Sequence, residues 1–386
     1  MTEAPIAPAY PALPAPSALT FGARPLPAPP PAFAVRLVLG LRRFLLRLAD
    51  RLSPAQIAVF DQCTGVANTA LLGAAARYGI ADYLAERGPA RAESIAAGLG
   101  LHADSVHRAL RALSNMGIFT MSADGAFSNN RLSLVLRSGQ LSRGREWALY
   151  FSSGSNASAW LDFARTLETG ESAFTRLHGM NVWQWFETHP DEREIFAHCM
   201  MGLTVLDAPL VASSYPFGEV QRLCDVGGGR GALLSEIVLR HPHLKAVLYD
   251  SPGVLASAAP LLSERGVSAR VELIPGSFFD SVPTGCDAYL MKNILHDWDD
   301  PTSERLLRNI RQAAAEGARL ILCESLVERN SRDLLGTRAD LQMMVACENG
   351  RERSLGEFQA LLSRAGFRYQ RVFAFPTLGI IEAAAA

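Results

Sequence analysis

The segment DVGGGRGALL, at residues 225–234, limits more strongly than any other what this chain can fold into. A short apolar stretch, RLCDV, leads into it, and an apolar run with helical spacing, ALLSEIVLRH, leads out of it. Between them stand four glycines, at positions 227, 228, 229 and 231. Glycine lets a backbone turn sharply and approach a ligand closely, and the N–H groups that open a helix attract an anionic group. The segment therefore predicts a strand, a ligand-binding turn and a helix.

Strands and helices are expected to alternate along the rest of the chain. Apolar stretches bounded by turn residues indicate strands, and apolar residues at helical spacing indicate helices. The expected strands lie at 222–226, 246–250, 270–276, 287–295, 318–325, 368–375 and 378–383, and the expected helices at 232–241, 252–266, from 301, 337–347 and 355–365. This alternation predicts an α/β, Rossmann-like domain with a mostly parallel sheet of seven strands. The last two strands are close enough in sequence to pair as a hairpin, which makes one strand antiparallel.

Asp250 indicates what the glycine turn binds. It ends the second expected strand, 25 residues after Asp225, where a carboxylate can accept both hydroxyls of a ribose. The turn reads G-x-G-x-G from Gly227, which differs from the G-x-G-x-x-G of dinucleotide-binding loops and disfavours a nicotinamide dehydrogenase. A nucleoside with a small anionic arm fits both features, and S-adenosylmethionine has that shape.

Residues 34–140 predict a separate helical domain. Apolar residues at helical spacing cover 69–88, with a break near Gly79. Residues 91–130 then follow the order helix, turn, helix and hairpin, with Asp104 as the expected cap of the second helix. This order is typical of a winged helix, which in other proteins binds DNA. The second helix offers only Arg108 and Arg111 beside His107, a thin footprint for phosphates, so we favour packing or dimerisation over DNA binding.

The two remaining parts of the chain carry less specific signals. Residues 1–33 are rich in proline and alanine and predict a disordered leader, while the amphipathic stretch 35–52 carries five arginines. Such a helix can lie on a membrane surface, but packing on its own protein or on a twin subunit is the favoured interpretation. Aromatic residues cluster in residues 141–215, a helical linker before the domain at 216–386, and they suit the wall of an apolar acceptor pocket.

Bulk properties exclude some classes of protein. The formal net charge of −1 gives no reason to expect nucleic acid as a partner. The six cysteines form no CxxC pair, and the N-terminus lacks the basic and apolar regions of a secretory signal, so we expect a cytoplasmic protein. No apolar run reaches the length of a membrane span. His241 and His243 flank a proline in a loop and do not indicate a metal site.

From about residue 34 onward, the chain resembles the S-adenosylmethionine-dependent O-methyltransferases of the plant caffeic acid type, a group that includes bacterial enzymes of natural-product tailoring. Four segments carry the resemblance: DVGGGRGA, YDSPGV, MKNILHDWDD and GRERSLGEF. They match the family's cofactor loop, its ribose-binding strand end, its catalytic segment and a later motif. The resemblance implies a Rossmann-like methyltransferase domain behind a winged-helix-like dimerisation domain, a homodimer, and methyl transfer to a hydroxyl of a small aromatic or polyketide-like molecule.

The resemblance also implies roles for individual residues. The implied cofactor-binding residues are Asp225, Gly227, Gly229, Asp250, Ser277, Phe278 and Lys292, and the implied acceptor-binding residues are Met200, Met201, Asn293 and Trp298. His296 is implied as the general base, with Glu324 and Glu352 holding it. Ser277 stands where the family commonly has an aspartate that meets adenine, so this contact is expected to be weaker, while Phe278 can stack on the ring. No metal is expected.

The chemistry of methyl transfer explains why a histidine suits this position. A phenol has a pKa of about 10, so a neutral imidazole with a pKa of about 6.5 can take its proton as the oxygen attacks. His296 and Glu324 follow two different expected strands, and ligands bind at the carboxyl edge of such sheets. Three alternatives stay open: nitrogen or carbon as the acceptor atom, and a cofactor-binding regulator without catalysis.

Overall fold

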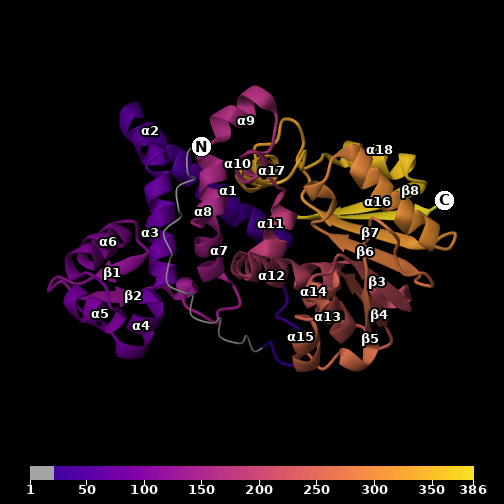
Figure 1. Cartoon of the computed structure of the whole chain (residues 1–386), viewed down its shortest axis with the longest axis horizontal. Helices are drawn as coiled ribbons and strands as arrows, with labels where there is room; N and C mark the ends of the chain where they lie inside the picture. The colour runs from indigo at the N-terminus through magenta and orange to yellow at the C-terminus, as the bar shows by residue number, and fades with distance from the viewer. Residues whose placement is uncertain (1–20) are drawn as a thin grey trace. The chain divides into compact units, whose positions relative to one another are not determined.

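The structure is a computed structural model in which residues 21–386 are described. These residues form two compact units. The first contains Phe44–Ser158 and Phe186–Gly202, and the second contains 21–43, Ala159–Trp185 and Leu203–Ala386. Residues 141–215, expected as a linker of their own, are thus divided between the two units. Each unit is described by itself below, with the elements labelled in Figure 1.

The first unit is mostly helical. Its elements are α2 (Ala55–Cys63), α3 (Gly65–Arg77), α4 (Ile80–Arg87), α5 (Ala92–Leu99), α6 (Ala103–Asn115), β1 (Phe119–Met121), β2 (Phe127–Asn129), η1 (Ser133–Leu136) and α7 (Gly144–Phe151). Four helices extend across the boundary between the units in the described chain: α1 (Ala32–Leu52), α8 (Gly154–Leu161), α11 (Val182–Thr188) and α12 (Pro190–Ser214). Helices α9 (Phe163–Thr169) and α10 (Ala173–His178) belong to the second unit.

The winged-helix prediction is confirmed by α5, α6 and the antiparallel pair of β1 and β2. Leu110, Leu113, Phe119 and Phe127 form part of the buried core beneath them. One detail of the prediction is wrong. The cap of α6 is His102, whose ring accepts the N–H of Ser105, while Asp104 lies in the first turn. A ring nitrogen takes the place of the expected carboxylate because the helix begins two residues earlier than a cap at Asp104 would imply.

The second unit is built on a seven-stranded sheet in the order β5-β4-β3-β6-β7-β9-β8. The strands are β3 (Arg222–Val226), β4 (Lys245–Asp250), β5 (Val271–Pro275), β6 (Ala288–Lys292), β7 (Arg319–Glu324), β8 (Phe367–Ala374) and β9 (Gly379–Ala385). In this sheet β9 alone runs opposite to the other strands, because it pairs antiparallel with both β7 and β8. The predicted sheet, hairpin and antiparallel strand are confirmed.

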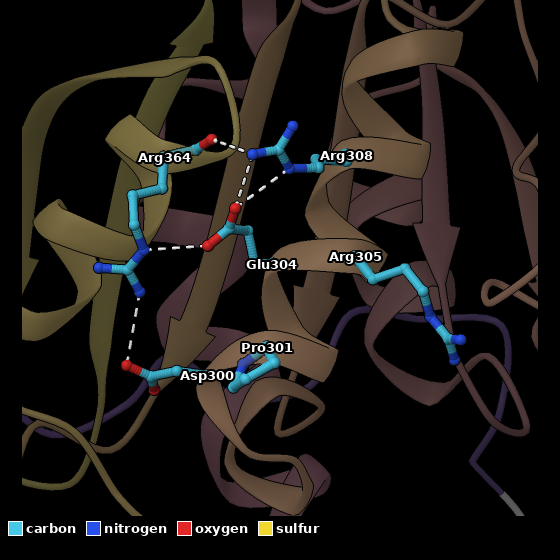
Figure 2. A pocket seen from close by; sticks show the side chains of 6 residues that line it. All are labelled: Asp300, Pro301, Glu304, Arg305, Arg308 and Arg364. Carbon is cyan, nitrogen blue, oxygen red and sulfur yellow. Dashed lines mark hydrogen bonds and ion pairs between the residues drawn. The ribbon is translucent and has the colours of Figure 1, made fainter.

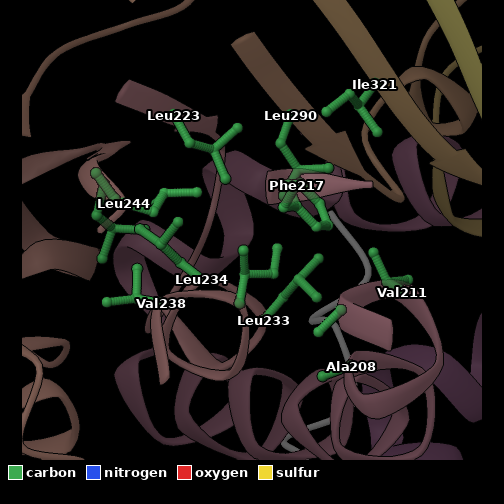
Figure 3. Close-up of a cluster of buried hydrophobic side chains, with 14 of the residues drawn as sticks. Ala208, Val211, Phe217, Leu223, Leu233, Leu234, Val238, Leu244, Leu290 and Ile321 are labelled. Atoms are coloured by element: carbon green, nitrogen blue, oxygen red, sulfur yellow. The ribbon is translucent and has the colours of Figure 1, made fainter. Parts of the chain in front are cut away.

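Helices cover both faces of the sheet (Figure 1). The end of α12, with α13 (Ala232–Arg240), α14 (Pro252–Leu255) and α15 (Ala259–Glu264), packs on one face. Figure 3 shows this core, in which Ala208 and Val211 of α12 meet Leu233 and Leu234 of α13 below the strands. On the other face lie α16 (Asp300–Ala313) and α18 (Leu355–Arg364). Helix α17 (Leu334–Ala346) and the short turns η2 (Phe217–Glu219), η3 (Ser268–Arg270) and η4 (Leu295–Asp297) complete the unit.

Two expected elements differ from the structure. The helix at 252–266 is divided into α14 and α15. The strand at 287–295 ends at Lys292, because Asn293 takes a left-handed backbone with φ of 54°. The chain then turns into η4, so His296 lies in a helical turn beyond the strand end.

The leader is anchored where the structure describes it, which differs from the expected disorder; residues 1–20 lie outside the described chain. Residues 21–31 have no helix or strand, but Leu26 N–H bonds both carboxylate oxygens of Glu236 at 3.0 and 3.1 Å. Arg265 donates to the carbonyls of Gly22 and Arg24 at 3.2 and 2.8 Å and pairs with Glu236. Both charged residues are almost fully buried. A buried ion pair in α13 and the end of α15 therefore holds the leader.

Helix α1 has no buried residue. Arg36 and Arg43 on one side donate to the carbonyls of Ala374 and Arg332 of the second unit. The apolar stripe on the other side is exposed, with Phe33 at 73% and Leu37 at 68%. Residues 21–386 thus leave this apolar face uncovered. Among the described helices, only α12 is long and apolar enough to cross a membrane, with 44% of its most apolar part inside the protein; core helices pass the same test.

Candidate active site

Four parallel strands bring the predicted residues to one edge of the sheet. The glycine loop follows β3, Asp250 ends β4, Lys292 ends β6 and Glu324 ends β7. The carboxyl ends of parallel strands meet at a common edge, where open α/β sheets bind their ligands. The candidate site therefore lies at this edge of the sheet, within the second unit.

The glycine loop closes tightly on its own neighbours. Gly227, Gly229 and Gly231 have φ of 71°, 60° and 77°, a region that disfavours side chains. A Cβ at Gly228 would lie 2.5 Å from Asp225 Oδ2, whereas one at Gly229 would meet nothing within 4 Å. The loop thus has an open side at Gly229, where a ligand can approach the backbone.

Asp250 is fixed by the same loop. Its Oδ2 accepts the N–H of Gly229 at 2.9 Å, and its Oδ1 accepts that of Ser251 at 2.7 Å. Burial raises the pKa of Asp250, and these backbone hydrogen bonds oppose the rise. Gly227 donates its own N–H to the carbonyl of Tyr249 at 2.8 Å, so any cofactor contact of Gly227 uses other atoms.

Asp225 fits the cofactor-binding role. Its carboxylate is 2% exposed, and its Oδ2 has no hydrogen-bond partner among residues 21–386. Burial and the neighbouring Asp250 raise the pKa of Asp225 to about 7, although Lys292 opposes this rise. A buried acceptor without a donor next to the glycine loop suits a ligand that brings N–H or O–H groups. The residues present therefore fit S-adenosylmethionine.

The predicted adenine contacts lie after β5. A Cβ at Gly227 would approach the ring of Phe278 to 3.5 Å, so this ring borders the glycine loop. Ser277 accepts the N–H of Phe279 at 3.2 Å, which fixes the turn and leaves its hydroxyl proton available. Their contacts with adenine stay predictions.

Lys292 has a partner that the sequence did not reveal. Its Nζ lies 3.3 Å from Asp207 Oδ2, and the lysine side chain is 8% exposed. Asp207 comes from the part of α12 that belongs to the second unit. Asp207 is not among the residues predicted from the sequence; the available signal was an acid within the apolar run GLTVLDAPLVA.

His296 stands among three carboxylates. Its Nδ1 lies 2.9 Å from Glu352 Oε1 and 4.0 Å from Glu324 Oε2, while its Nε2 lies 3.5 Å from Asp297 Oδ1. Glu324 also accepts the N–H groups of Ile294 and Leu295 at 3.1 and 2.9 Å, and so it fixes the start of η4. The structure brings His296, Glu324 and Glu352 together, as the resemblance implied.

The carboxylates change the protonation expected for His296. Burial alone would lower the pKa of His296, but Asp297, Glu352 and Glu324 raise this pKa to about 10. Burial raises the pKa of Asp297 to about 7 and also raises that of Glu324. The three carboxylates therefore favour the protonated imidazole over the neutral form of an ordinary histidine at pH 7.

Asp297 is a second residue that sequence reasoning missed. It is 8% exposed and lies next to His296 in η4, facing Nε2. Cys347 Sγ lies 3.7 Å from its Oδ1, and burial with Asp297 raises the pKa of this thiol. The run of acids in HDWDD was a visible signal, but it did not show which acid turns inward.

Two of the four predicted acceptor-binding residues lie beside His296 in sequence. Trp298 stacks on Trp183 at 6.4 Å and meets Phe279 edge-on at 4.8 Å. Its indole N–H is buried without a partner in the described part of the chain. Asn293 has the left-handed backbone noted above, a state that is uncommon outside glycine but that asparagine adopts more readily than most residues.

Met200 and Met201 lie in the part of α12 that belongs to the first unit. There, Arg143 Nη2 approaches Met201 Sδ at 3.9 Å, and Met201 is buried. The predicted acceptor-binding roles of these four residues are not tested by the structure.

Two further features of the described chain are a surface depression and a group of possible metal ligands. A shallow depression of about 390 Å³ lies over α16 and α18, lined by charged residues such as Glu304 and Arg308 (Figure 2). Its charged walls do not suit an aromatic acceptor. His296, Glu324 and Glu352 place donor atoms within 4.8 Å of one another, close enough for a divalent cation. The expectation that no metal takes part stays a prediction.

Comparison with known sequences gives consistent matches. Residues 160–368 match the O-methyltransferase domain family, and residues 60–138 match the O-methyltransferase dimerisation domain. The mitomycin biosynthesis 6-O-methyltransferase of Streptomyces lavendulae is 34% identical over 82% of this chain and 90% of its own. The 8-amino-8-demethylriboflavin N,N-dimethyltransferase of Streptomyces davaonensis is 33% identical over 77% of this chain and 86% of its own.

Solved structures agree with these matches. The structure of LaPhzM has a TM-score of 0.83 at 32% identity, over 86% of this chain and all of its own. The neocarzinostatin O-methyltransferase NcsB1, in complex with S-adenosylmethionine and 2-hydroxy-5-methyl naphthoic acid, has a TM-score of 0.72 at 30% identity, over 83% of this chain and 96% of its own. With its glycine loop, Asp250 and the match over both domains, this chain belongs to the family of S-adenosylmethionine-dependent O-methyltransferases that tailor natural products.

Proposed function

We propose that the protein transfers the methyl group of S-adenosylmethionine to a phenolic hydroxyl of a small aromatic or polyketide-like molecule, with His296 as the general base. One observation carries the proposal. His296 is held through Nδ1 by Glu352 at 2.9 Å, at the strand edge that also bears the glycine loop. Nε2, which lies 3.5 Å from Asp297 Oδ1, is then the ring nitrogen that exchanges a proton with an acceptor.

The chain's own contribution is positioning and proton transfer. When bound, S-adenosylmethionine supplies a methyl group that its sulfonium already activates. Glu352 and Glu324 orient the imidazole, and Asp297 stabilises the cation that forms on it. The pKa of His296, about 10, is close to the pKa of about 10 of a phenol, so sharing the proton costs little. The acceptor oxygen then has phenolate character when it attacks the methyl carbon.

The names of similar proteins support an aromatic acceptor. NcsB1 was solved with a hydroxylated naphthoic acid, and another relative is named 3-amino-4-hydroxybenzoate 4-O-methyltransferase. Each of these two molecules carries a phenolic hydroxyl and a carboxylate on the same aromatic ring system. We extend this substrate class, flat hydroxylated arenes, to the present chain.

A nitrogen acceptor is the second candidate. Two relatives, at 33% and 31% identity, are named as N-methyltransferases. The two candidates differ in what they ask of His296, because a neutral aryl amine attacks with its lone pair and loses its proton afterwards. An aromatic amine should therefore depend less on the base than a phenol does.

The test uses panels of phenols and aryl amines with isotope-labelled S-adenosylmethionine. Wild type should label phenols, and His296→Gln should lose about 10²–10⁴-fold in turnover. Calorimetry with S-adenosylhomocysteine should give nearly equal affinity for both proteins. Full activity of His296→Gln on the least acidic phenol would remove the base from the proposal.

We also propose a cytoplasmic homodimer that works without a metal. The support is the match of residues 60–138 to a dimerisation domain, together with the exposed apolar stripe on α1. That stripe continues on α2, where Ile57 and Phe60 are 52% and 64% exposed. A twin subunit is the partner that would cover both helices.

A further inference from the structure

We propose that Arg353 is a positioning residue of the methyl transfer, whose buried guanidinium clamps the turn that carries His296 and so keeps the imidazole on Glu352. The inference rests on the proposed role of His296 as the base. It concerns how the ring is held, and no contact between Arg353 and a ligand is required.

The hydrogen bonds of Arg353 converge on this turn. The side chain is fully buried, and its Nη1 donates to the carbonyl of Leu295 at 2.6 Å while its Nη2 donates to that of Trp298 at 2.7 Å. These two residues flank His296 and Asp297. The guanidinium is a rigid, planar fork of donors, so one side chain fixes the distance between the two carbonyls and the turn between them.

The residues next to Arg353 hold the same turn. Arg351 donates its backbone N–H to the carbonyl of His296 at 2.8 Å, and Glu352 binds the imidazole at 2.9 Å. Three consecutive residues thus hold the backbone, the ring and the flanks of His296. Gly350 allows this approach, since a Cβ there would lie 3.0 Å from the carbonyl oxygen of His296.

A surface network neutralises the buried charge of Arg353. Its Nε donates to Asp300 Oδ1 at 2.9 Å, and the side chain of Asp300 is 41% exposed. Figure 2 shows Arg364 reaching the other oxygen of Asp300, and the same arginine binds Glu304. The depression described above is therefore the outer end of this network. The side chain of Arg364 contacts Glu304 and Asp300 but no residue of η4, which makes it a matched control.

Loss of the clamp should release the imidazole. Without Arg353 the turn keeps the bonds that Glu324 makes with Ile294 and Leu295 and the bond from Arg351 N–H to the carbonyl of His296. It loses the guanidinium bridge between the carbonyls of Leu295 and Trp298. The ring can then leave Glu352. A displacement of about 1 Å from the reacting geometry costs about 10²-fold in rate.

The test compares Arg353→Met, Arg353→Lys and the control Arg364→Met in the full-length protein. NMR of histidine labelled at Cε1 follows the titration of the imidazole, and the His296→Gln variant identifies the signal. Three carboxylates face the imidazole of His296: Asp297 from η4, Glu352 from the loop before α18 and Glu324 from the end of β7. None of the three is substituted in these variants. In Arg353→Met the pKa of His296 should fall by about one unit, because the imidazolium loses its contact with the Glu352 carboxylate. An opposite charge within contact distance raises the pKa of a histidine by about 1–3 units.

Turnover supplies the second readout. Arg353→Met should lose about 10²-fold in kcat on a phenol, while affinity for S-adenosylhomocysteine changes by less than about twofold because the cofactor residues are not disturbed. The kcat of Arg353→Lys should lie between those of wild type and Arg353→Met, since an ammonium cannot bridge two carbonyls in the way a guanidinium does. Arg364→Met should match wild type in both readouts.

An unchanged titration of His296 in folded Arg353→Met, with unchanged kcat, would overturn the proposal. If Arg353→Met does not fold, the same two readouts on Arg353→Lys decide. The proposed function fails separately, through full activity of His296→Gln, because the NMR titration reports the clamp whether or not His296 is the base.

Discussion

A change in pH at saturating cofactor tests the proton chemistry of His296 directly. In the proposed mechanism, productive complexes hold one proton shared between the acceptor oxygen and Nε2, so a weakly acidic phenol needs the imidazole in its neutral form. With a pKa of about 10 for His296, only about 10⁻³ of the protein has a neutral imidazole at pH 7. The value of kcat/KM should therefore rise by about tenfold per pH unit above neutrality.

The bound cofactor modifies this expectation in a known direction. Its sulfonium cation disfavours the imidazolium, and a like charge within several ångströms lowers a pKa by about 1–3 units. We therefore expect the acid limb of kcat/KM to lie between about pH 8 and 10 for a phenol of pKa 10. An ordinary histidine would place this limb at about 6.5.

The assay measures release of S-adenosylhomocysteine from about pH 6 to 10 with phenols of graded acidity. Some acceptors ionise below the pKa of His296. With them, a phenolate that binds to the imidazolium gives a complex with the same single shared proton as a phenol that binds to the neutral imidazole. The acid limb of kcat/KM should then follow the acceptor's own pKa. The His296→Gln variant is the control, in which every limb should follow the acceptor. A wild-type limb at or below about pH 7 with the least acidic phenol would refute the role assigned to the carboxylates.

Three further predictions concern the cofactor, the leader and the assembly. Asp250→Ala should weaken S-adenosylhomocysteine binding in calorimetry by about 10²-fold or more, since it removes two charge-assisted hydrogen bonds, whereas the exposed Asp280→Ala should bind normally. Arg265→Met should lower the free energy of unfolding by about 1.5–3 kcal/mol in denaturant titration, because it removes a charge-assisted bond from the buried Glu236, which then keeps Arg240 as its guanidinium partner; a loss below about 1 kcal/mol would show that the anchored leader is not built on this pair. Phe44→Glu, in the exposed stripe of α1, should shift sedimentation equilibrium toward the monomer, and an unchanged dimer at micromolar concentration would exclude α1 from the interface.

Local sequence patterns determined much of the architecture. The strand at 222–226 has the predicted bounds, because an apolar stretch ahead of a glycine turn has few alternative structures. The alternation of strands and helices specified a parallel sheet, and parallel connection places all carboxyl ends at one edge. This reasoning predicts Asp250, His296 and Glu324 along one edge. Lys292, which the sequence predicts inside the strand 287–295, ends that strand in the structure.

Only the tertiary structure decided how the site's charges interact. Glu352 lies 56 residues after His296, and its contact with Nδ1 depends on how the loop before α18 packs on η4. Asp297 turns inward because Asn293 has a left-handed backbone that redirects the chain after β6. The pKa of His296 follows from the summed distances to these acids, and sequence spacing does not encode such distances.

The leader and α1 illustrate the same limit. Composition predicted disorder for residues 21–33, yet their N–H and carbonyl groups meet a buried ion pair in helices more than 200 residues away. A helical pattern gave α1 correctly, since 3.6-residue periodicity is local. Which surface covers its apolar face depends on partners in space, because the hydrophobic effect responds to any apolar surface and carries no information on sequence position.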